Sequence, residues 1–166
     1  MTAWGLIDDR TGHTGQVLGV IGKLGLPYML KRLDYGLLGK LPPQLLGASL
    51  LGLDRRSSAT LLPPWPSLVI AAGSHTLPVL RYIKAQSPQT VTVYLMWPGN
   101  TRGIDLVAAP VHDHPPEGAN VITTMAPLHA VTPETLASAR QVWEPQLAHL
   151  PRPWVALTLG GDTKQG

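Results

Sequence analysis

The chain has 166 residues, enough for one domain with a hydrophobic core that needs no disulfide or metal cross-link. It contains no cysteine, which excludes disulfides, zinc–thiolate sites, iron–sulfur clusters and thiol catalysis. A net charge of +3 is too weak to indicate nucleic-acid binding, and 5% aromatic residues argue against stacking on single strands. No apolar run reaches the ~18 residues of a membrane span, and no basic leader opens the chain. The sequence therefore predicts a cytoplasmic protein, with a membrane surface as the alternative location.

Short apolar or β-branched runs alternate with segments of helical periodicity along the chain. The predicted strands are, in chain order, Ala3–Ile7, Tyr28–Leu33, Ser67–Ala72, Thr90–Met96, Asp105–Ala109, Asn120–Thr124 and Trp154–Leu159. The predicted helices are Gln16–Leu24, a leucine-rich helix or hairpin within residues 41–53, the segment that follows Ser74 and ends at Gln86, and Pro133 to about Leu150. Thr11–Gly15 has the composition of a turn, and Gly25 stands where a C-cap is expected.

Two of the predicted helices begin at recognisable capping residues. Ser74 is expected to be the N-cap of the helix that ends at Gln86. Thr132 is expected to be the N-cap of the last helix, with Pro133 at the first helical position. Because Thr135 replaces the usual glutamate, this start is predicted to lack a full capping box.

The alternation of strands and helices predicts an α/β fold, a Rossmann-like parallel sheet with helices on both faces. The strands are almost continuously apolar, as a sheet covered on both faces requires. Ligands of such sheets bind at the carboxyl ends of the strands. The segments expected to line a site are therefore 8–16, 73–76, 97–102, 110–120 and 160–166.

The densest polar cluster follows the first strand and contains Asp8, Asp9, Arg10 and His13. A carboxylate beside a histidine at a strand end suits general-base activation of a hydroxyl group. We therefore predict Asp8 and His13 as catalytic residues, with Asp9 and Arg10 contacting the substrate. The alternative is that one aspartate caps the following turn and that the other side chains are solvated.

Glycines at positions 12, 15 and 19 resemble the dinucleotide-binding fingerprint, although the last glycine comes one residue too late. The neighbouring aspartates would repel a pyrophosphate, and no tyrosine has a lysine four residues on, the pair that short-chain dehydrogenases and sugar epimerases use. Three possibilities remain: a nicotinamide site, a plain tight turn, or a turn that binds an anionic or hydroxyl-rich ligand. The last predicts that Gly12, Gly15 and Gln16 contact the substrate.

Further polar residues stand at other predicted strand ends. Gly73 and Ser74 precede a helix, where backbone N–H groups favour anions. His112 and Asp113 are expected to line the edge of the cleft; a metal held by His112 and His114 lacks an evident third ligand. We predict neither a metal nor a cofactor.

Several segments, taken in order, resemble the mitochondrial-fission "elongated mitochondria" family, whose bacterial members are often labelled nucleoside-diphosphate-sugar epimerases. The residues that carry the resemblance are Trp4 to Arg10 with Gly12, His13, Gln16, Leu18 and Gly19; Leu68 to Gly73 with Arg81, Ile83 and Lys84; Asp105 to Val107 with Pro110, His112 and Asp113; Asn120, Val121 and Thr124; Val131 to Pro133 with Leu136; and Gly160, Gly161 and Lys164. The ordered set is specific, whereas no single motif is. It covers nearly the whole chain but only the N-terminal half of the family.

The resemblance implies two α/β domains of GT-B glycosyltransferase type, a nucleotide-sugar and an acceptor as substrates, and no bound metal. Residues 1–150 would be the acceptor-side domain. Residues 151–166 would be a linker and the first strand and glycine loop of a truncated second domain. In that loop Gly160, Gly161 and Lys164 would face the donor. This half alone is expected to be inactive and to expose apolar surface where the missing C-terminal domain packs. The alternatives are an epimerase that uses NAD and a non-enzymatic adaptor of the fission type.

Overall fold

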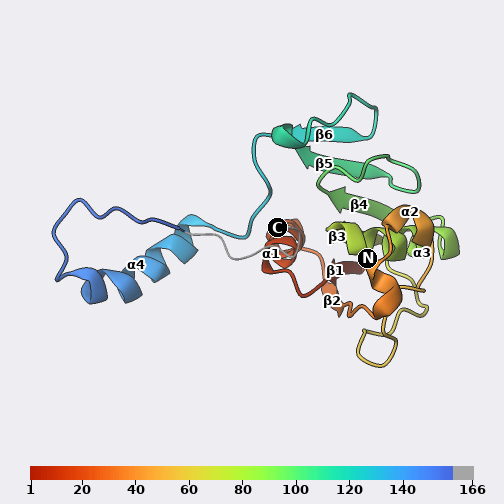
Figure 1. Ribbon diagram of the computed structural model, residues 1–166, viewed down its shortest axis with the longest axis horizontal. Coiled ribbons are helices and arrows are strands. Elements are labelled where there is room, and N and C mark those ends of the chain that lie inside the picture. The colour runs from red at the N-terminus through yellow and green to blue at the C-terminus, as the bar shows by residue number, and fades with distance from the viewer. Residues whose placement is uncertain (159–166) are drawn as a thin grey trace. The chain divides into compact units, whose positions relative to one another are not determined.

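Six parallel strands form the central sheet in the computed structural model, which describes residues 1–158. The strands are β1 (Ala3–Ile7), β2 (Tyr28–Arg32), β3 (Leu68–Ala72), β4 (Val91–Leu95), β5 (Leu106–Pro110) and β6 (Val121–Thr124). Their order across the sheet is β2-β1-β3-β4-β5-β6 (Figure 1). The predicted α/β class with a Rossmann-like parallel sheet is confirmed.

Helices α1 (Thr11–Ile21) and α3 (Leu77–Gln86) cover opposite faces of the sheet (Figure 1). The connections from β4 to β5 and from β5 to β6 contain no α-helix. The outer strand β6 is consequently only partly covered, and Ile122 in it is exposed. The best-covered strands are β1 and β3, in the middle of the sheet.

Side-chain alternation along these strands separates the core into two layers. Trp4 and Leu6 of β1 pack with Leu80 and Ile83 of α3 on one face. On the other face Ala3 of β1 packs with Val17 and Ile21 of α1. Gly5 shares this second face, and a Cβ there would come within 2.9 Å of the Val17 side chain. The missing side chain at position 5 therefore lets α1 lie close to the sheet.

Helix α1 begins earlier than the sequence indicates. Thr11–Gly15 was predicted to be a turn, but it forms the first part of the helix. The prediction was wrong because the chain reverses before Thr11. The Arg10 N–H donates to a carboxylate oxygen of Asp8 at 3.1 Å, and the Thr14 hydroxyl donates to the Asp8 carbonyl at 3.2 Å. Gly25 has a φ of 64° after a 3-10 turn that prolongs α1, as a C-cap glycine should.

The long connection from β2 to β3 contains short elements instead of the predicted leucine-rich helix or hairpin. A 3-10 turn over Leu37–Lys40 is followed by α2 (Pro43–Leu46), a single helical turn. Gly47, with a φ of 59°, ends α2 in a conformation that continues no helix. The leucines divide in consequence: Leu46 and Leu61 are buried, whereas Leu37, Leu45 and others are exposed.

The two predicted caps have opposite outcomes. Ser74 caps no helix, because residues 74–76 form a 3-10 turn and α3 begins after it. The hydroxyl of Thr76 turns back instead and donates to the carbonyls of Ala72 and Gly73. Thr132 does cap α4 (Pro133–Leu147), and the full capping box is present, since the Thr135 hydroxyl accepts a hydrogen bond from the Thr132 N–H at 2.8 Å. Threonine thus replaces glutamate in this role.

The chain divides into two compact units, Met1–Ala130 and Val131–Gly166. The second unit contains α4, which continues through Pro145 to Leu147. Trp154–Leu159 was predicted as a strand, but residues 154–158 form no regular structure and residue 159 lies outside the described part. The assignment of residues 1–150 and 151–166 to two domains stays a prediction.

None of the helices within residues 1–158 has the length and apolar character needed to span a bilayer.

Two glycines of α1 provide a matched test of how closely this helix packs against the backbone of His129. A Cβ at Gly19 would overlap the carbonyl oxygen of His129, whereas a Cβ at Gly15 meets nothing within 4 Å. We expect Gly19→Ala to lower the free energy of unfolding by about 1–3 kcal/mol, because backbone must move. Gly15→Ala should raise it by about 0.5–1 kcal/mol through helix propensity. Urea denaturation of both variants measures the difference, and equal stabilities would contradict the packing described.

Candidate functional site

The strand order places a topological switch point between β1 and β3. The chain leaves β1 toward β2 on one side and later leaves β3 toward β4 on the other. The loops that follow β1 and β3 therefore diverge and leave a crevice between them, the usual position of a ligand site in open α/β sheets. The loop after β1 carries Asp8 and Arg10, and the loop after β3 carries Gly73 and Ser74.

Asp8 and His13 form a hydrogen-bonded pair at this crevice. The His13 Nδ1 lies 3.2 Å from Asp8 Oδ2, and the Asp8 side chain is only 1% exposed. Burial raises the pKa of the Asp8 carboxyl, but hydrogen bonds from His13 and from the Arg10 N–H, with the nearby positive charges, outweigh burial and leave that pKa below its ordinary value. Asp8 is thus an ionised acceptor that orients the imidazole.

Gly73 allows the imidazole to lie against the loop after β3. Its φ of 88° is a backbone conformation that residues other than glycine rarely adopt. A Cβ at this position would also overlap the ring of His13. Gly73 is therefore required twice, for the turn and for the approach of His13.

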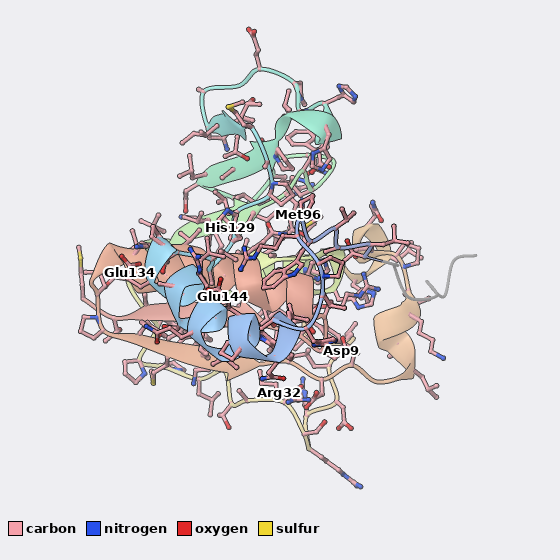
Figure 2. All side chains as sticks on the ribbon, turned by 90° about the vertical axis from the view of Figure 1, so that its left-hand side faces the viewer. Asp9, Arg32, Met96, His129, Glu134 and Glu144 are labelled. Carbon is pink, nitrogen blue, oxygen red and sulfur yellow. The ribbon has the colours of Figure 1, made fainter. Side chains whose placement is uncertain are left out.

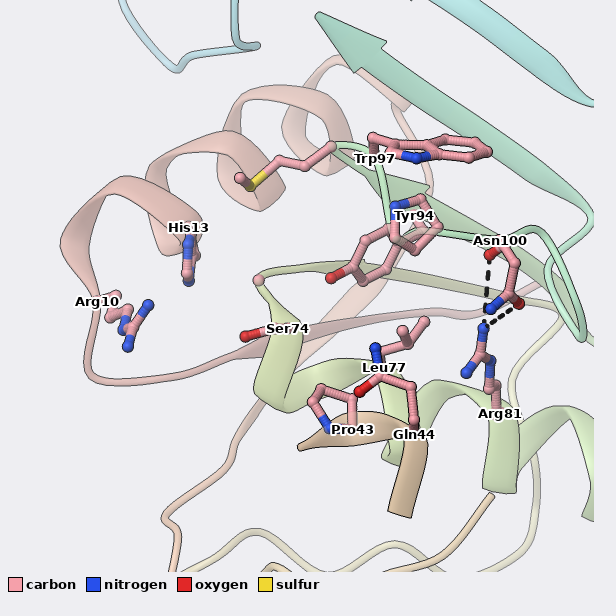
Figure 3. A pocket seen from close by; sticks show the side chains of 13 residues that line it. Arg10, His13, Pro43, Gln44, Ser74, Leu77, Arg81, Tyr94, Trp97 and Asn100 are labelled. Atoms are coloured by element: carbon pink, nitrogen blue, oxygen red, sulfur yellow. Dashed lines mark hydrogen bonds between the residues drawn. The ribbon is translucent and has the colours of Figure 1, made fainter. Parts of the chain in front are cut away.

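A cavity of about 250 Å³ opens beside this pair, and His13 forms part of its wall (Figure 3). Its lining residues come from both crevice loops, from α2, from the start of α3 and from the end of β4 with the loop after it. They are Arg10, His13, Pro43, Gln44, Gly73, Ser74, Leu77, Arg81, Tyr94, Met96, Trp97, Pro98 and Asn100. The lining includes two arginines and no carboxylate.

The loop after β4 is held in place by bonds that do not involve a ligand. Met96 has a φ of 96°, which is unusual for a residue with a side chain. The next N–H, that of Trp97, donates to an Asp113 carboxylate oxygen at 3.1 Å. Arg81 donates to the Asn100 side-chain oxygen at 2.8 Å and to the Arg102 carbonyl at 2.9 Å (Figure 3). These contacts fix one wall of the cavity.

His75, in the turn after β3, and Tyr35 do not line the cavity. Their rings are 5.2 Å apart. Burial lowers the pKa of His75, and the positive charge of Arg10 acts in the same direction. Burial likewise raises the pKa of Tyr35, and the Asp8 carboxylate adds to that increase. Both side chains are therefore neutral near pH 7.

The structure brings together part of the predicted site. Arg10, His13, Gly73 and Ser74 line the cavity, and Asp8 lies directly behind His13. Asp9 lies on the surface outside the cavity (Figure 2). The remaining predicted contacts from α1 do not line it either; they are Gly12, Gly15 and Gln16.

The predicted residues after β5 and near the C-terminus have other positions. His112 is largely exposed, and Asp113 supports the cavity from behind through Trp97. No cluster of three or more potential metal-ligating side chains occurs within residues 1–158. The predicted donor-loop residues Gly160, Gly161 and Lys164 lie outside the described residues.

Among the cavity-lining residues that sequence reasoning missed are the polar side chains of Arg81, Tyr94 and Asn100. The segment 97–102 was expected at the site, but no residue in it was selected. A usable indication was the alternation in β4, where Thr92 and Tyr94 share one face of the strand. Tyr94 is the last such position before the carboxyl end of the strand.

The hydrogen-bonded carboxylate of Asp8 predicts an acid-sensitive contribution to stability. Because its pKa is lower in the folded chain than the unfolded value of about 3.9, the contribution is complete above that value and is lost as the pH falls through the folded pKa. We expect Asp8→Asn to lower the free energy of unfolding at pH 7 by about 1–3 kcal/mol. At pH 3 the difference in free energy of unfolding between this variant and the wild type should be smaller. Urea denaturation at both pH values tests this. In the control Asp9→Asn, which removes an exposed carboxylate, the loss at pH 7 should be much smaller.

Comparison with known proteins shows which family the chain resembles. The family model described as "Mitochondrial fission ELM1" matches residues 11–166. An uncharacterised protein of Rickettsia prowazekii is 30% identical over 116 residues, which cover 69% of this chain and 33% of that protein. The chain thus spans about a third of the length of this relative. No solved structure matches the present chain significantly. Since the family model covers most of the chain, the chain belongs to the mitochondrial fission ELM1 family.

Proposed function

We propose that the chain is the acceptor-side part of a glycosyltransferase, which transfers a sugar from a nucleotide-sugar to a hydroxyl group of an acceptor. The observation that carries this proposal is the buried Asp8–His13 pair at the switch point, with His13 in the wall of a cavity. A carboxylate-oriented histidine at a ligand crevice is an arrangement suited to general-base catalysis.

The pair has a defined chemical role in this proposal. In this proposal Asp8 accepts a hydrogen bond from Nδ1–H of His13, the tautomer in which Nε2 of the neutral imidazole carries the lone pair. Nε2 accepts the proton of the acceptor hydroxyl as that oxygen bonds to the anomeric carbon of the sugar. The bond from this carbon to the diphosphate breaks at the same time, and the nucleoside diphosphate leaves with its electron pair. Asp8 stabilises the imidazolium that forms.

The positions of the α1 glycines support this proposal over an NAD-dependent epimerase. Gly12 and Gly15 do not line the cavity, and Gly19 packs against the carbonyl of His129. A dinucleotide site needs such glycines in the turn that approaches the pyrophosphate. Here they lie inside a helix that starts at Thr11. The donor contacts proposed for Gly160, Gly161 and Lys164, and a C-terminal donor domain, belong to the same proposal.

Activity of the full-length protein tests the role of the pair. With a panel of nucleoside-diphosphate sugars, release of nucleoside diphosphate measures both transfer and hydrolysis. We expect His13→Gln to lower kcat by about 10²–10⁴-fold, since a general base contributes in that range. Asp8→Asn should lower kcat as well, because the imidazole loses its orienting carboxylate.

The matched control is His149→Gln, which removes an exposed histidine that lies outside the cavity. It should retain the wild-type kcat. Turnover that His13→Gln and Asp8→Asn leave unchanged would refute the assigned roles. Absence of turnover with every sugar in the panel would count against the transferase proposal itself.

A further inference from the structure

The hydroxyl group of one cavity residue, Tyr94, has no protein partner within residues 1–158. Tyr94 is 2% exposed and lines the cavity, and its hydroxyl makes no hydrogen bond to any of residues 1–158. Figure 3 shows this hydroxyl directed into the space near Ser74 and His13. A hydroxyl group that opens onto a cavity and has no partner in the protein is free to bond a ligand atom there.

The protonation of Tyr94 determines whether its hydroxyl group bonds an acceptor or a donor atom of a ligand. Burial raises the pKa of its hydroxyl, and the Asp8 carboxylate contributes in the same direction. The group is therefore a neutral phenol over the physiological range, with a proton to donate. The serine hydroxyl of Ser74, exposed and without a hydrogen-bond partner among the described residues, is a second available donor. Such donors favour a ligand that is rich in acceptor oxygens.

The charges of the cavity wall point to an anion. Arg10 makes no ion pair with any side chain in the described range, and Arg81 bonds only to uncharged oxygens, those of Asn100 and Arg102. The cavity has no carboxylate in its lining. Asp8 is hydrogen-bonded to His13, and its charge also interacts with that of Arg10. Two guanidinium groups that form no side-chain ion pair, set in one concave site, attract an anion, and a phosphate suits their planar donor geometry.

From this arrangement we propose that the cavity binds a phosphate monoester, held by Arg10, the Tyr94 hydroxyl and Ser74, with Arg81 adding positive charge at the other end. The cavity of about 250 Å³ is smaller than the ~300–1,000 Å³ of sites that enclose a whole drug-sized ligand. It therefore takes one polar part of a larger molecule. In combination with the proposed function, on which this step rests, the acceptor is a phosphorylated compound whose phosphate positions a nearby hydroxyl at His13.

Binding to the full 166-residue chain tests the proposal without any donor sugar. The probes for calorimetric or NMR titration are glucose 6-phosphate and inorganic phosphate, with glucose as the uncharged control. We expect glucose 6-phosphate to bind at least about tenfold more tightly than glucose, as expected for charge-assisted hydrogen bonds. Arg10→Gln should raise its Kd about tenfold or more. Tyr94→Phe, which keeps the ring, should raise it about threefold to tenfold.

The matched control is Arg56→Gln, which removes an exposed arginine outside the cavity. It should leave the Kd unchanged, and circular dichroism should show all three variants folded. Equal effects of Arg10→Gln and Arg56→Gln would show only general electrostatic attraction and would overturn the proposal. Equal binding of glucose and glucose 6-phosphate would overturn it too.

A second set of titrations distinguishes a soluble phosphate from a lipid headgroup. Vesicles of phosphatidylcholine with phosphatidic acid present the same monoester, and vesicles of phosphatidylcholine alone are the control. Arg10-dependent binding to either phosphate source supports the proposal and identifies the source, whereas binding to neither refutes it. Phosphate binding without sugar transfer by the full-length protein would refute the proposed function alone. Transfer without phosphate binding would refute this inference alone.

Discussion

The contact between the His13 ring and the backbone of Gly73 determines how the candidate site is assembled. It joins the first turn of α1, directly after the loop that follows β1, to the loop after β3. The strand order directs these two segments apart. With any side chain at position 73 the imidazole would have to move away, and its bond to Asp8 would be disturbed. The crevice of an open α/β sheet is a general consequence of topology, whereas its occupation by a histidine–aspartate pair depends on this one close approach.

A separate polar network stabilises the sheet away from the cavity, near the amino ends of β4 and β5. Lys84 of α3 donates to Asp105 at 2.8 Å, and the Thr92 backbone N–H donates to the same carboxylate at 2.7 Å. Burial raises the pKa of Asp105, but the hydrogen bonds from Lys84 and Thr92 outweigh burial and leave that pKa below its ordinary value. This network ties the start of β5 to β4 and α3, at the sheet edge opposite the site. The residues that perform chemistry in our proposal are thus distinct from those that hold the strands together.

The sequence was sufficient to predict the six strands of the sheet, because buried parallel strands are short, almost continuous apolar runs. The same signal was misleading at residues 154–158, which form no strand. The sequence was also insufficient at Thr11–Gly15, where the glycines resemble a turn. The bonds that start the helix involve Asp8, three residues before it. Asp8 and His13 could be paired from the sequence since only five positions separate them. Tyr94 and Arg81 are remote from that pair in sequence. Their convergence on the cavity depends on the strand order, on the face of β4 that Tyr94 occupies and on the packing of α3, which carries Arg81.

The hydrogen bond from the Trp97 N–H to Asp113 has a consequence for how specificity evolves. Asp113 belongs to the turn after β5, whereas the wall that it supports follows β4. A substitution at position 113 would alter the shape of the cavity although no atom of that residue lines it. Relatives with the same lining residues but a different residue at this position would therefore accept differently shaped ligands. Comparisons of specificity within the family should include such supporting positions together with the lining itself.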